Sequence, residues 1–199
     1  MRSALAAALR TEAGGWRSLA RWVTRRPDVP AGGTAFPYRS AQVAPILVFT
    51  AVSLIEVVGL DLLLRPWPAA RAVLLVLGVW GVLFCLGMLA AITVHPHVVD
   101  PEGVRVRSGA TVDLHLPWES IASARRVRRG HEARAVSRDA TAVNVAVSHD
   151  TTVEIALAHP VLLRVHGEDA EVTVVRLHAD DAAGFVTAVR RRIEVASGR

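Results

Sequence analysis

Residues 72–94 read AVLLVLGVWGVLFCLGMLAAITV, an apolar run without a charged side chain. Residues 43–64 form a second run, VAPILVFTAVSLIEVVGLDLLL. At about 1.5 Å of rise per residue, each run is long enough to cross a bilayer hydrocarbon core of roughly 30 Å. Neither run shows the polar stripe of a helix at a water surface. We therefore expect two transmembrane helices joined by a short turn, rather than a buried hairpin in a soluble protein.

The charges that flank these runs predict the orientation of the hairpin. The chain has a formal net charge of +5, and the excess lies in residues 1–41, which hold seven arginines and two acidic residues. The turn has only Arg65 and Arg71, whereas Arg105 and Arg107 soon follow the second run. Because cytoplasmic flanks are enriched in basic residues, we expect a multi-pass protein of the inner (plasma) membrane with both termini in the cytoplasm.

The first 26 residues combine an apolar and a basic helical face. At 100° per residue, the two faces are formed by Leu5, Leu9, Trp16, Leu19 and Val23 and by Arg10, Arg17, Arg21 and Arg25. Such a helix can lie on an anionic membrane surface, with Arg10, Arg17 and Arg21 as contacts. Glu12 on the apolar face and the pair Gly14-Gly15 leave a second interpretation open, a disordered basic tail that only sets topology.

The segment before the first apolar run is predicted to be a linker. Residues 28–34 contain Pro30 and two adjacent glycines, which are typical of loops. Phe36 and Tyr38 follow, next to the first membrane run. Because aromatic rings are favoured at the membrane–water interface, we expect both side chains to lie there. We therefore assign residues 1–41 to a basic N-terminal arm.

From residue 95 onward, apolar residues alternate with polar ones. The alternating segments are residues 104–107, 112–116, 143–147, 153–157, 161–165 and 173–177. Alternation between turn signals predicts antiparallel strands with one buried face. After a cap at Asp180 or Asp181, Phe185, Val189 and Ile193 line one side of a C-terminal helix. The expected fold is an α+β domain over residues 95–199, a small barrel or sandwich capped by that helix.

Four short motifs carry a resemblance to a known family. They are VDPEGVRVRSG at residues 99–109, LPWESIASA at 116–124, AHPVLL at 158–163 and DDAAGFV at 180–186. Over residues 95–195 the chain resembles the bacterial pleckstrin-homology-like (PH-like) domains, which often follow a pair of transmembrane helices. The resemblance implies an antiparallel β-barrel or sandwich with a C-terminal helix. It also implies an adaptor or scaffold role, and it supplies no catalytic residues.

The sequence ARRVRRG at residues 124–130 holds four arginines, Arg125, Arg126, Arg128 and Arg129. A nucleic-acid surface is disfavoured, because residues 95–199 hold as many acidic residues as arginines and only two aromatic ones. Two interpretations stay open. The run is either an exposed strand end or a contact with anionic lipid headgroups, to which each arginine would contribute about 1 kcal/mol.

Two acidic residues interrupt the first apolar run. Glu56 lies near its middle, where a carboxylate costs roughly 2.5–3.5 kcal/mol. It is either a proton or ion relay within an oligomer or, as we favour, a protonated group bonded to the neighbouring helix. Asp61 lies nearer the outer end and can reach water or Arg65. In the second run, the small residues Gly87 and Ala91 predict close helix packing.

No motif predicts catalysis. The eight histidines show no HExxH spacing, and Cys85 is the single cysteine. We expect a membrane-anchored, non-enzymatic binding or scaffold protein without a metal or cofactor. Its expected partners are the lipid bilayer, a protein or a second copy of the chain, and anionic headgroups, but not nucleic acid. The alternative is an oligomeric transport or sensing component that uses Glu56.

Overall fold

The two apolar runs form a helical hairpin in the computed structural model, which describes residues 2–130, 136–139, 141–165 and 168–197. Helix α2 is Ser40–Leu63 and helix α3 is Pro68–Val94. Both are long and apolar enough to span a membrane, with mean hydropathies of 2.3 and 2.6. Only 6% and 22% of their most apolar windows are buried, whereas a core helix of a soluble protein would be mostly buried. Helix α2 begins three residues before the predicted run and ends one residue before its end, and α3 begins four residues before its predicted run.

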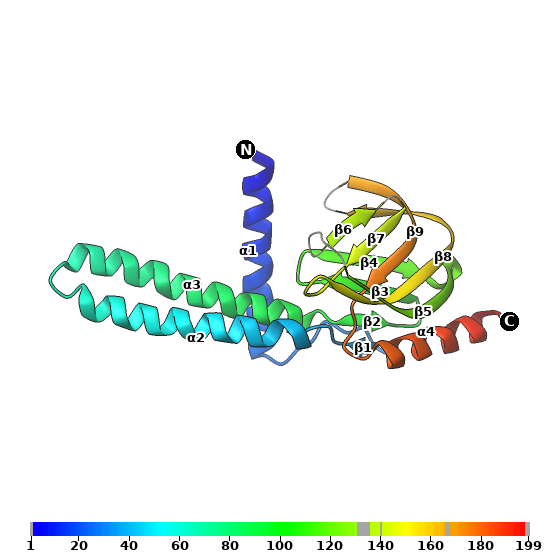
Figure 1. Cartoon of the computed structure of the whole chain (residues 1–199), viewed down its shortest axis with the longest axis horizontal. Coiled ribbons are helices and arrows are strands. Elements are labelled where there is room, and N and C mark those ends of the chain that lie inside the picture. The colour runs from blue at the N-terminus through cyan, green and yellow to red at the C-terminus, as the bar shows by residue number, and fades with distance from the viewer. Residues whose placement is uncertain (1, 131–135, 140, 166–167, 198–199) are drawn as a thin grey trace.

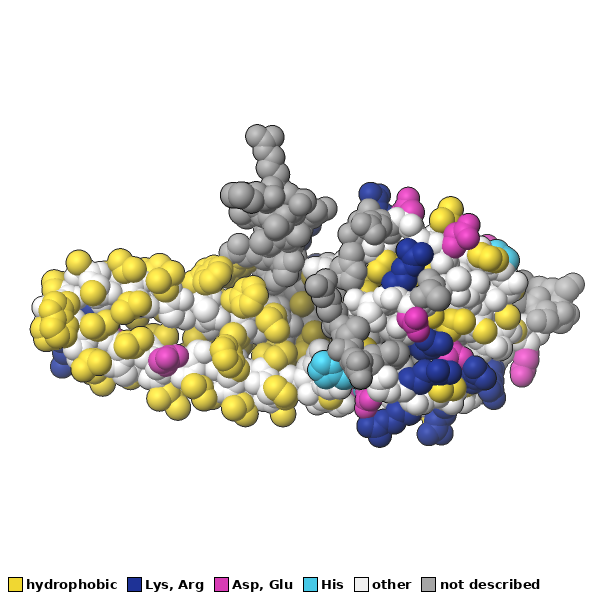
Figure 2. Space-filling model, turned by 45° about the horizontal axis from the view of Figure 1, so that its top comes forward, with side chains coloured by type: hydrophobic (Ala, Val, Ile, Leu, Met, Phe, Trp, Pro, Cys, Tyr) yellow, Lys and Arg dark blue, Asp and Glu magenta, His cyan; other side chains and the backbone are white. Residues whose placement is uncertain are grey.

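One close contact fixes how α2 packs against α3. A side chain at Gly78 of α3 would collide with the γ-carbon of Val57 on α2, so the missing side chain admits the valine. The two helices extend together to one side of the molecule, away from the strands (Figure 1). Hydrophobic side chains cover the hairpin, whereas charged side chains gather over the strands (Figure 2).

The strands form two sheets rather than a closed barrel. The first sheet has the order β1-β2-β3-β4, with bounds Thr34–Phe36, His97–Val99, Gly103–Ser108 and Val112–Pro117. The second has the order β5-β8-β9-β7-β6, with bounds Ile121–Gly130, Asp150–Val165, Glu168–Leu177, Ala142–Val145 and Val136–Asp139. A 3-10 turn, η1 (Trp118–Ser120), joins the sheets. The expected α+β class is confirmed at this coarse level, and we call the two sheets with their C-terminal helix the β-domain.

Pairing within the sheets is antiparallel apart from one ladder. Strands β7 and β9 run parallel, which the alternating sequence pattern alone could not reveal. Helix α4 (Ala182–Ser197) follows β9, and the carboxylate of Asp181 accepts a hydrogen bond from the N–H of Gly184 at 2.8 Å in its first turn. Phe185 and Val189 of α4 are fully buried in the core shared with both sheets. The amphipathic C-terminal helix therefore caps the sheets as expected.

The first strand of the β-domain comes from before the hairpin. β1 pairs with β2, although α2 and α3 lie between these two strands in the sequence. Thr34 is opposite Val99, and Phe36 is opposite His97. Phe36 and Tyr38 are 8% and 2% exposed, so they belong to the domain interior instead of the membrane interface. Their expected interfacial position was wrong, because burial against the sheet and proximity to a membrane helix favour the same aromatic residues.

Candidate functional site: the junction of hairpin and β-domain

Helix α1 (Arg2–Val23) crosses α3 close to where the hairpin meets the β-domain (Figure 1). The contact is made by small residues. A Cβ atom at Gly87 of α3 would lie 3.6 Å from the main chain of Gly15, and Ser18 is fully buried. Gly87 and Ala91 are both buried, and Gly87 packs against α1. Of the two glycines that weaken the helical prediction for the arm, Gly14 lies against the β3–β4 turn, where a Cβ atom would come within 2.9 Å of the Cβ atom of Ala110.

The second half of α1 carries partly exposed indole rings and exposed arginines. Trp16 and Trp22 are 45% and 37% exposed, Arg17 is exposed on α1, and Arg25 is exposed in the turn that follows α1. Arg21 instead donates to the carboxylate of Asp28 at 3.0 Å. The side chain of Arg10 lies outside the described residues. The described part of α1 is thus a continuous helix, which favours the helical interpretation of the arm over a disordered tail.

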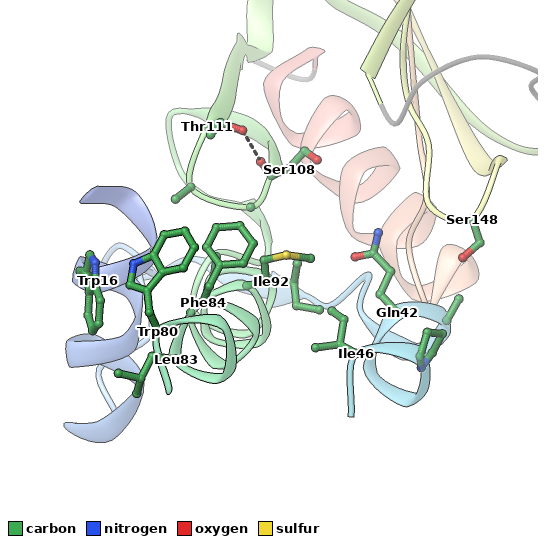
Figure 3. Close-up of a pocket in the computed structure, with 18 residues that line it drawn as sticks. Trp16, Gln42, Ile46, Trp80, Leu83, Phe84, Ile92, Ser108, Thr111 and Ser148 are labelled. Atoms are coloured by element: carbon green, nitrogen blue, oxygen red, sulfur yellow. Dashed lines mark hydrogen bonds between the residues drawn. The ribbon is translucent and has the colours of Figure 1, made fainter. Parts of the chain in front are cut away.

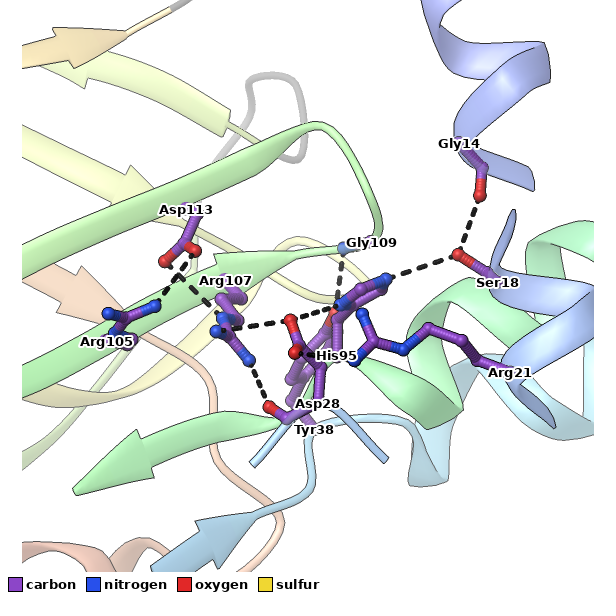
Figure 4. Close-up of polar contacts among 10 residues, drawn as sticks. All are labelled: Gly14, Ser18, Arg21, Asp28, Tyr38, His95, Arg105, Arg107, Gly109 and Asp113. Atoms are coloured by element: carbon purple, nitrogen blue, oxygen red, sulfur yellow. Dashed lines mark hydrogen bonds and ion pairs between the residues drawn. The ribbon is translucent and has the colours of Figure 1, made fainter. Parts of the chain in front are cut away.

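Asp28, in the predicted linker, connects three elements (Figure 4). Its carboxylate lies 3.4 Å from Nη2 of Arg107 on β3 and 3.4 Å from Nδ1 of His95 at the end of α3. Its carbonyl accepts a hydrogen bond from Nη1 of Arg107 at 2.6 Å. Its own N–H donates to the carbonyl of Val94 at 2.9 Å. Together with the contact from Arg21, these bonds tie α1, α3 and the β-domain to one residue.

Arg107 is the buried cation of this network. Its side chain is only 3% exposed, and its Nε lies 3.4 Å from the carboxylate of Asp113 on β4. A buried guanidinium is stable only when anions and carbonyls surround it. Asp28 and Asp113 supply that environment from opposite sides, so the arginine holds the linker against the sheet.

His95 adds a group that can titrate to the junction. Its Nε2 lies 3.3 Å from the hydroxyl of Ser18 on α1. Burial lowers the pKa of His95 below its ordinary value, Arg107 lowers it further, and the nearby Asp28 offsets part of this shift. The neutral imidazole is therefore the form favoured at neutral pH.

A second tie joins the start of α2 to the end of β9. The carboxylate of Asp180 accepts hydrogen bonds from the hydroxyl of Ser40 at 2.6 Å and from its N–H at 3.2 Å. The N–H of Asp180 donates to the carbonyl of Pro37 at 2.9 Å. An acidic side chain at a helix N-terminus also complements the helix dipole. Asp180, one of the two residues expected to cap α4, thus caps α2 instead, and Asp181 serves α4.

Tyr38 and His97 fix the segment between these ties. The hydroxyl of Tyr38 accepts a hydrogen bond from the N–H of Gly109 at 2.8 Å, and burial raises the pKa of Tyr38 to about 12. Nδ1 of His97 accepts from the N–H of Arg107 at 3.0 Å, and Nε2 lies 2.9 Å from the carbonyl of His178. Burial lowers the pKa of His97 to about 4. These partners assign the neutral ring with its proton on Nε2.

A cavity of about 420 Å³ lies beside the junction, between α1, the base of the hairpin and the β3–β4 turn (Figure 3). Its apolar wall includes Trp16, Ile46, Trp80, Phe84, Met88 and Ile92. Gln42 and Ser148 contribute polar groups at its other side, and Thr111 contributes one from the β3–β4 turn. None of the described residues that line it is charged. Such a lining suits an apolar ligand or acyl chain with a few hydrogen-bonding groups.

The arginine run lies on β5 and is largely paired with acidic residues of β8. Glu154 is 4% exposed and receives Arg125, Arg129 and, from β9, Arg176. The Nε atoms of Arg125 and Arg176 each lie 2.9 Å from its oxygens. Burial raises the pKa of Glu154, but the hydrogen bonds from Arg176 and Arg125 outweigh this and hold the pKa below its ordinary value.

The other two arginines of the run differ from each other. Arg128 donates to the carboxylate of Asp150 at 2.6 Å, with 79% of its side chain exposed. Arg126 forms no ion pair among the described residues. Strand register explains the pairing, because β5 and β8 place Arg125 opposite Glu154 and Gly130 opposite Asp150. Sequence reasoning missed Glu154, although an acidic residue between Val153 and Ile155 in a strand is a signal for a paired buried charge.

The two acidic residues of α2 have different surroundings. Asp61 forms a two-pronged ion pair with Arg71 of α3, at 2.7 and 2.9 Å, and not with Arg65. The hairpin turn explains this choice, because it brings the start of α3 beside the end of α2. Glu56 is exposed on the surface of α2, and no hydrogen bond to it is found among the described residues. The expected bond from Glu56 to the neighbouring helix is therefore not present in this chain.

Nothing in the described part of the chain groups three or more His, Cys, Asp or Glu side chains around a possible metal position. Comparisons of this chain with protein-family models, with curated proteins and with solved structures find no match. The function therefore has to be argued from the junction itself.

Proposed function

We propose that this chain is a membrane-anchored, non-enzymatic scaffold protein that presents its β-domain at the cytoplasmic face of the inner membrane. The hairpin of α2 and α3 is the anchor. The arginine excess before α2 supports the orientation, because basic flanks stay in the cytoplasm. The PH-like motifs support a binding role for the β-domain, exercised on a protein or on the membrane surface.

The junction around Asp28 carries this proposal. A flexible tether would need no buried ion pairs, whereas Arg107 and Asp28 bind the end of α3 to the sheet. With the hairpin across a bilayer, α1 would lie along the membrane surface, since it crosses α3 (Figure 1). The exposed rings of Trp16 and Trp22 favour that depth. The scaffold would thus hold its binding surface in one orientation relative to the membrane.

Cysteine labelling tests the membrane placement. In a Cys85→Ser background, single cysteines are introduced as Trp67→Cys at the hairpin turn and as Arg126→Cys on β5. A membrane-impermeant maleimide added to intact spheroplasts should label the first and leave the second unlabelled until the membrane is permeabilised. Labelling of both, or of Arg126→Cys alone, would refute the proposed topology.

Crosslinking in native membranes tests the scaffold role. Mass spectrometry would compare the partners of the full chain with those of Arg107→Ala and Arg105→Ala. Arg105 lies two residues away on β3 and pairs with Asp100 and Asp113 but not with Asp28, so its variant is the matched control. We expect Arg105→Ala to keep the partners and Arg107→Ala to lose most of them while still inserting. An unchanged partner set in Arg107→Ala would contradict a scaffold of fixed orientation.

Helix α1 and the turn that follows it support a further contact, with anionic headgroups. Arg17 and Arg25 are exposed next to indole rings, and each such arginine contributes about 1 kcal/mol near an anionic leaflet. For the full chain in vesicles, tryptophan quenching by brominated lipid should increase when phosphatidylglycerol is added to phosphatidylcholine. The double variant Arg17→Ala/Arg25→Ala should lose that increase. If the variant keeps the increase, these two arginines do not contribute to binding of anionic headgroups.

The cavity supports a second candidate function, the binding of an acyl chain at the junction. Its apolar wall continues onto the exposed face of α3, where Trp80 and Met88 are 48% and 45% exposed. A chain in the cavity would place its ester region near Gln42 and Ser148. Native mass spectrometry should detect a retained lipid that is lost in Met88→Trp and kept in the control Val76→Trp; equal retention would contradict the proposal.

The alternative role in transport or sensing depends on Glu56. The hairpin encloses no pathway by itself, so this role would require several copies around a common axis. Complementation of a deletion strain by Glu56→Gln separates the two functions, because the amide keeps hydrogen bonding but cannot carry a proton. Full complementation is expected for the scaffold and would rule out proton coupling.

A further inference from the structure

The outward face of α2 carries five residues at regular spacing. We call this set the Glu56 seam, and its members are Phe49, Val52, Glu56, Gly59 and Leu63. Their separations of three and four residues follow the a and d positions of a heptad, and at 100° per residue they fall within an arc of roughly 80°. Phe49, Val52 and Leu63 are 65%, 55% and 68% exposed. The seam therefore has the pattern of a helix-pairing surface, and the residues that the structure describes leave it uncovered.

The other parts of the chain lie elsewhere. α1 packs on α3, and the β-domain lies beyond the opposite end of the hairpin from the turn (Figure 1). Figure 2 shows an acidic side chain within the otherwise hydrophobic surface of the hairpin. A side chain at Gly59 would meet no atom within 4 Å, so the backbone is open next to Glu56. A second helix could reach the seam without displacing any described element.

A carboxyl group at this depth requires a partner. An acidic side chain near the centre of a bilayer is costly when nothing binds it. Asp61 of α2 has such a partner within the chain, because it forms an ion pair with Arg71 of α3. Glu56 has no such contact among the described residues, and five positions separate it from Asp61. Its partner must therefore come from outside this chain.

We propose that α2 pairs with α2 of a second copy of this chain through the Glu56 seam. A protonated carboxyl group both donates and accepts a hydrogen bond, so two copies related by a twofold axis satisfy each other at one central position. Gly59, one turn away, lets the two backbones approach, and the 3-4 spacing matches the crossing of a left-handed helix pair. The pairing would align two β-domains on the same side of the membrane.

The proposal rests on the placement of the hairpin in a membrane. Its test uses the full chain, singly labelled with a fluorophore and reconstituted at low density into vesicles of phosphatidylcholine and phosphatidylglycerol. Single-molecule photobleaching then counts the copies at each spot. We expect dimers for the wild type and for Glu56→Gln, whose amide also donates and accepts. Glu56→Leu and Gly59→Leu should each lower the dimerisation constant by about tenfold.

The matched control is Gly81→Leu. Gly81 of α3 has the same open space around it as Gly59 but lies outside the seam. Its substitution should leave dimerisation unchanged, and an equal loss there would overturn the assignment of the seam. A wild type that is monomeric at every density would overturn pairing between copies.

The outcomes also separate this proposal from the proposed anchor function. A monomer in which Trp67→Cys is labelled from outside shows a correct anchor without the seam contact. Failure of that labelling shows instead that the hairpin does not insert, and then both proposals fail. A monomer in vesicles that associates through Glu56 only in native membranes would assign the seam to a different membrane protein and would overturn pairing with a second copy.

Discussion

The hairpin and the β-domain satisfy their polar side chains in opposite ways. In the β-domain, Glu154 and Arg107 are 4% and 3% exposed, and each is held by oppositely charged groups of the same chain. In the hairpin, Asp61 is paired at the turn, but Glu56 faces outward. An unpaired charge is costly in either environment. The buried charges of Glu154 and Arg107 are thus paired within the chain, whereas Glu56 has no ion pair among the described residues.

Their apolar side chains show the same contrast. Leu116, Ile155 and Phe185 of the β-domain are fully buried, whereas Ile55 and Val76 of the hairpin are 73% and 68% exposed. Burial of such side chains stabilises a fold by about 1.5–3 kcal/mol each in water. The β-domain gains this stabilisation by burying apolar side chains in its own core. The hairpin can gain it only by contact with lipid or with another protein. The stability of one region is thus internal, and that of the other depends on its surroundings.

The largest expected effect is the loss of stability in Glu154→Ala, which removes the anion from a buried ion-pair cluster of the β-domain. This change leaves Arg176, whose side chain is 15% exposed, without its anion. Removing one partner of a buried ion pair costs about 3–5 kcal/mol. We expect a decrease near the lower value in the free energy of unfolding, because Arg125 and Arg129 are exposed and regain water. Chemical denaturation of the full chain in detergent, followed by near-UV circular dichroism, measures it.

A small effect of Glu154→Ala, below about 1 kcal/mol, would show that water reaches this site and would weaken the contrast between the regions. Glu154→Gln is the companion variant, since it keeps the size and one acceptor oxygen. It should lie between the wild type and Glu154→Ala.

The next effect is a pH dependence from a buried histidine of the β-domain. Folding lowers the pKa of His97 from 6.5 to about 4 through burial, so the unfolded chain binds a proton that the folded chain excludes. Stability is therefore complete above pH 6.5 and declines as the pH falls toward 4, by roughly 3 kcal/mol in total. The measurement is the midpoint of thermal unfolding between pH 7.5 and 4.

His97→Asn identifies the source of this slope. The amide can still accept from the N–H of Arg107 but does not titrate, so the variant should be less stable at pH 7 and flatter with pH. If the wild type and His97→Asn keep the same slope, the proton is bound elsewhere, for example at His95.

Local sequence patterns were sufficient for the elements but not for their partners. The length of the apolar runs predicted both helices of the hairpin, and alternation predicted β3, β4, β7 and β9, because each signal lies within one element. The segments 153–157 and 161–165, which were predicted separately, form the single strand β8. The pairing of β1 with β2 brings together Phe36 and His97 from either side of the hairpin. No local pattern encodes that contact. The parallel ladder of β7 and β9 was missed for the same reason.

The candidate site was predicted less well than the fold. Asp28 stands in a segment rich in Pro and Gly, which indicated only a loop, yet it connects α1, α3 and β3. The arginine run was visible in the sequence, but Glu154, which receives two of its members, lies 29 residues from Arg125. Glu56 was noticed because a carboxylate in a membrane run is costly, and only the structure shows which way it faces.

Inside the hairpin, the sharpest test of packing is Gly78→Leu. The new side chain would collide with Val57, and overpacking of this kind costs about 1–3 kcal/mol. Gly81→Leu adds the same side chain to the same helix where no atom lies within 4 Å, so it should cost less. Unfolding of the hairpin in mixed micelles of increasing dodecyl sulfate measures both. Equal effects would mean that helix propensity, not the contact with Val57, decides the stability of the hairpin.

The smallest expected effect lies on the surface of the β-domain, in Arg128→Ala. Arg128 pairs with Asp150 at 2.6 Å, but its side chain is 79% exposed, so water competes for both charges. Exposed ion pairs contribute about 0–1 kcal/mol, and salt screens them. Denaturation at low and high ionic strength should therefore show a small loss that disappears with salt. A loss as large as that of Glu154→Ala would mean that this edge of β5 is covered in the native protein, and the internal balance of the β-domain would then also depend on a neighbour.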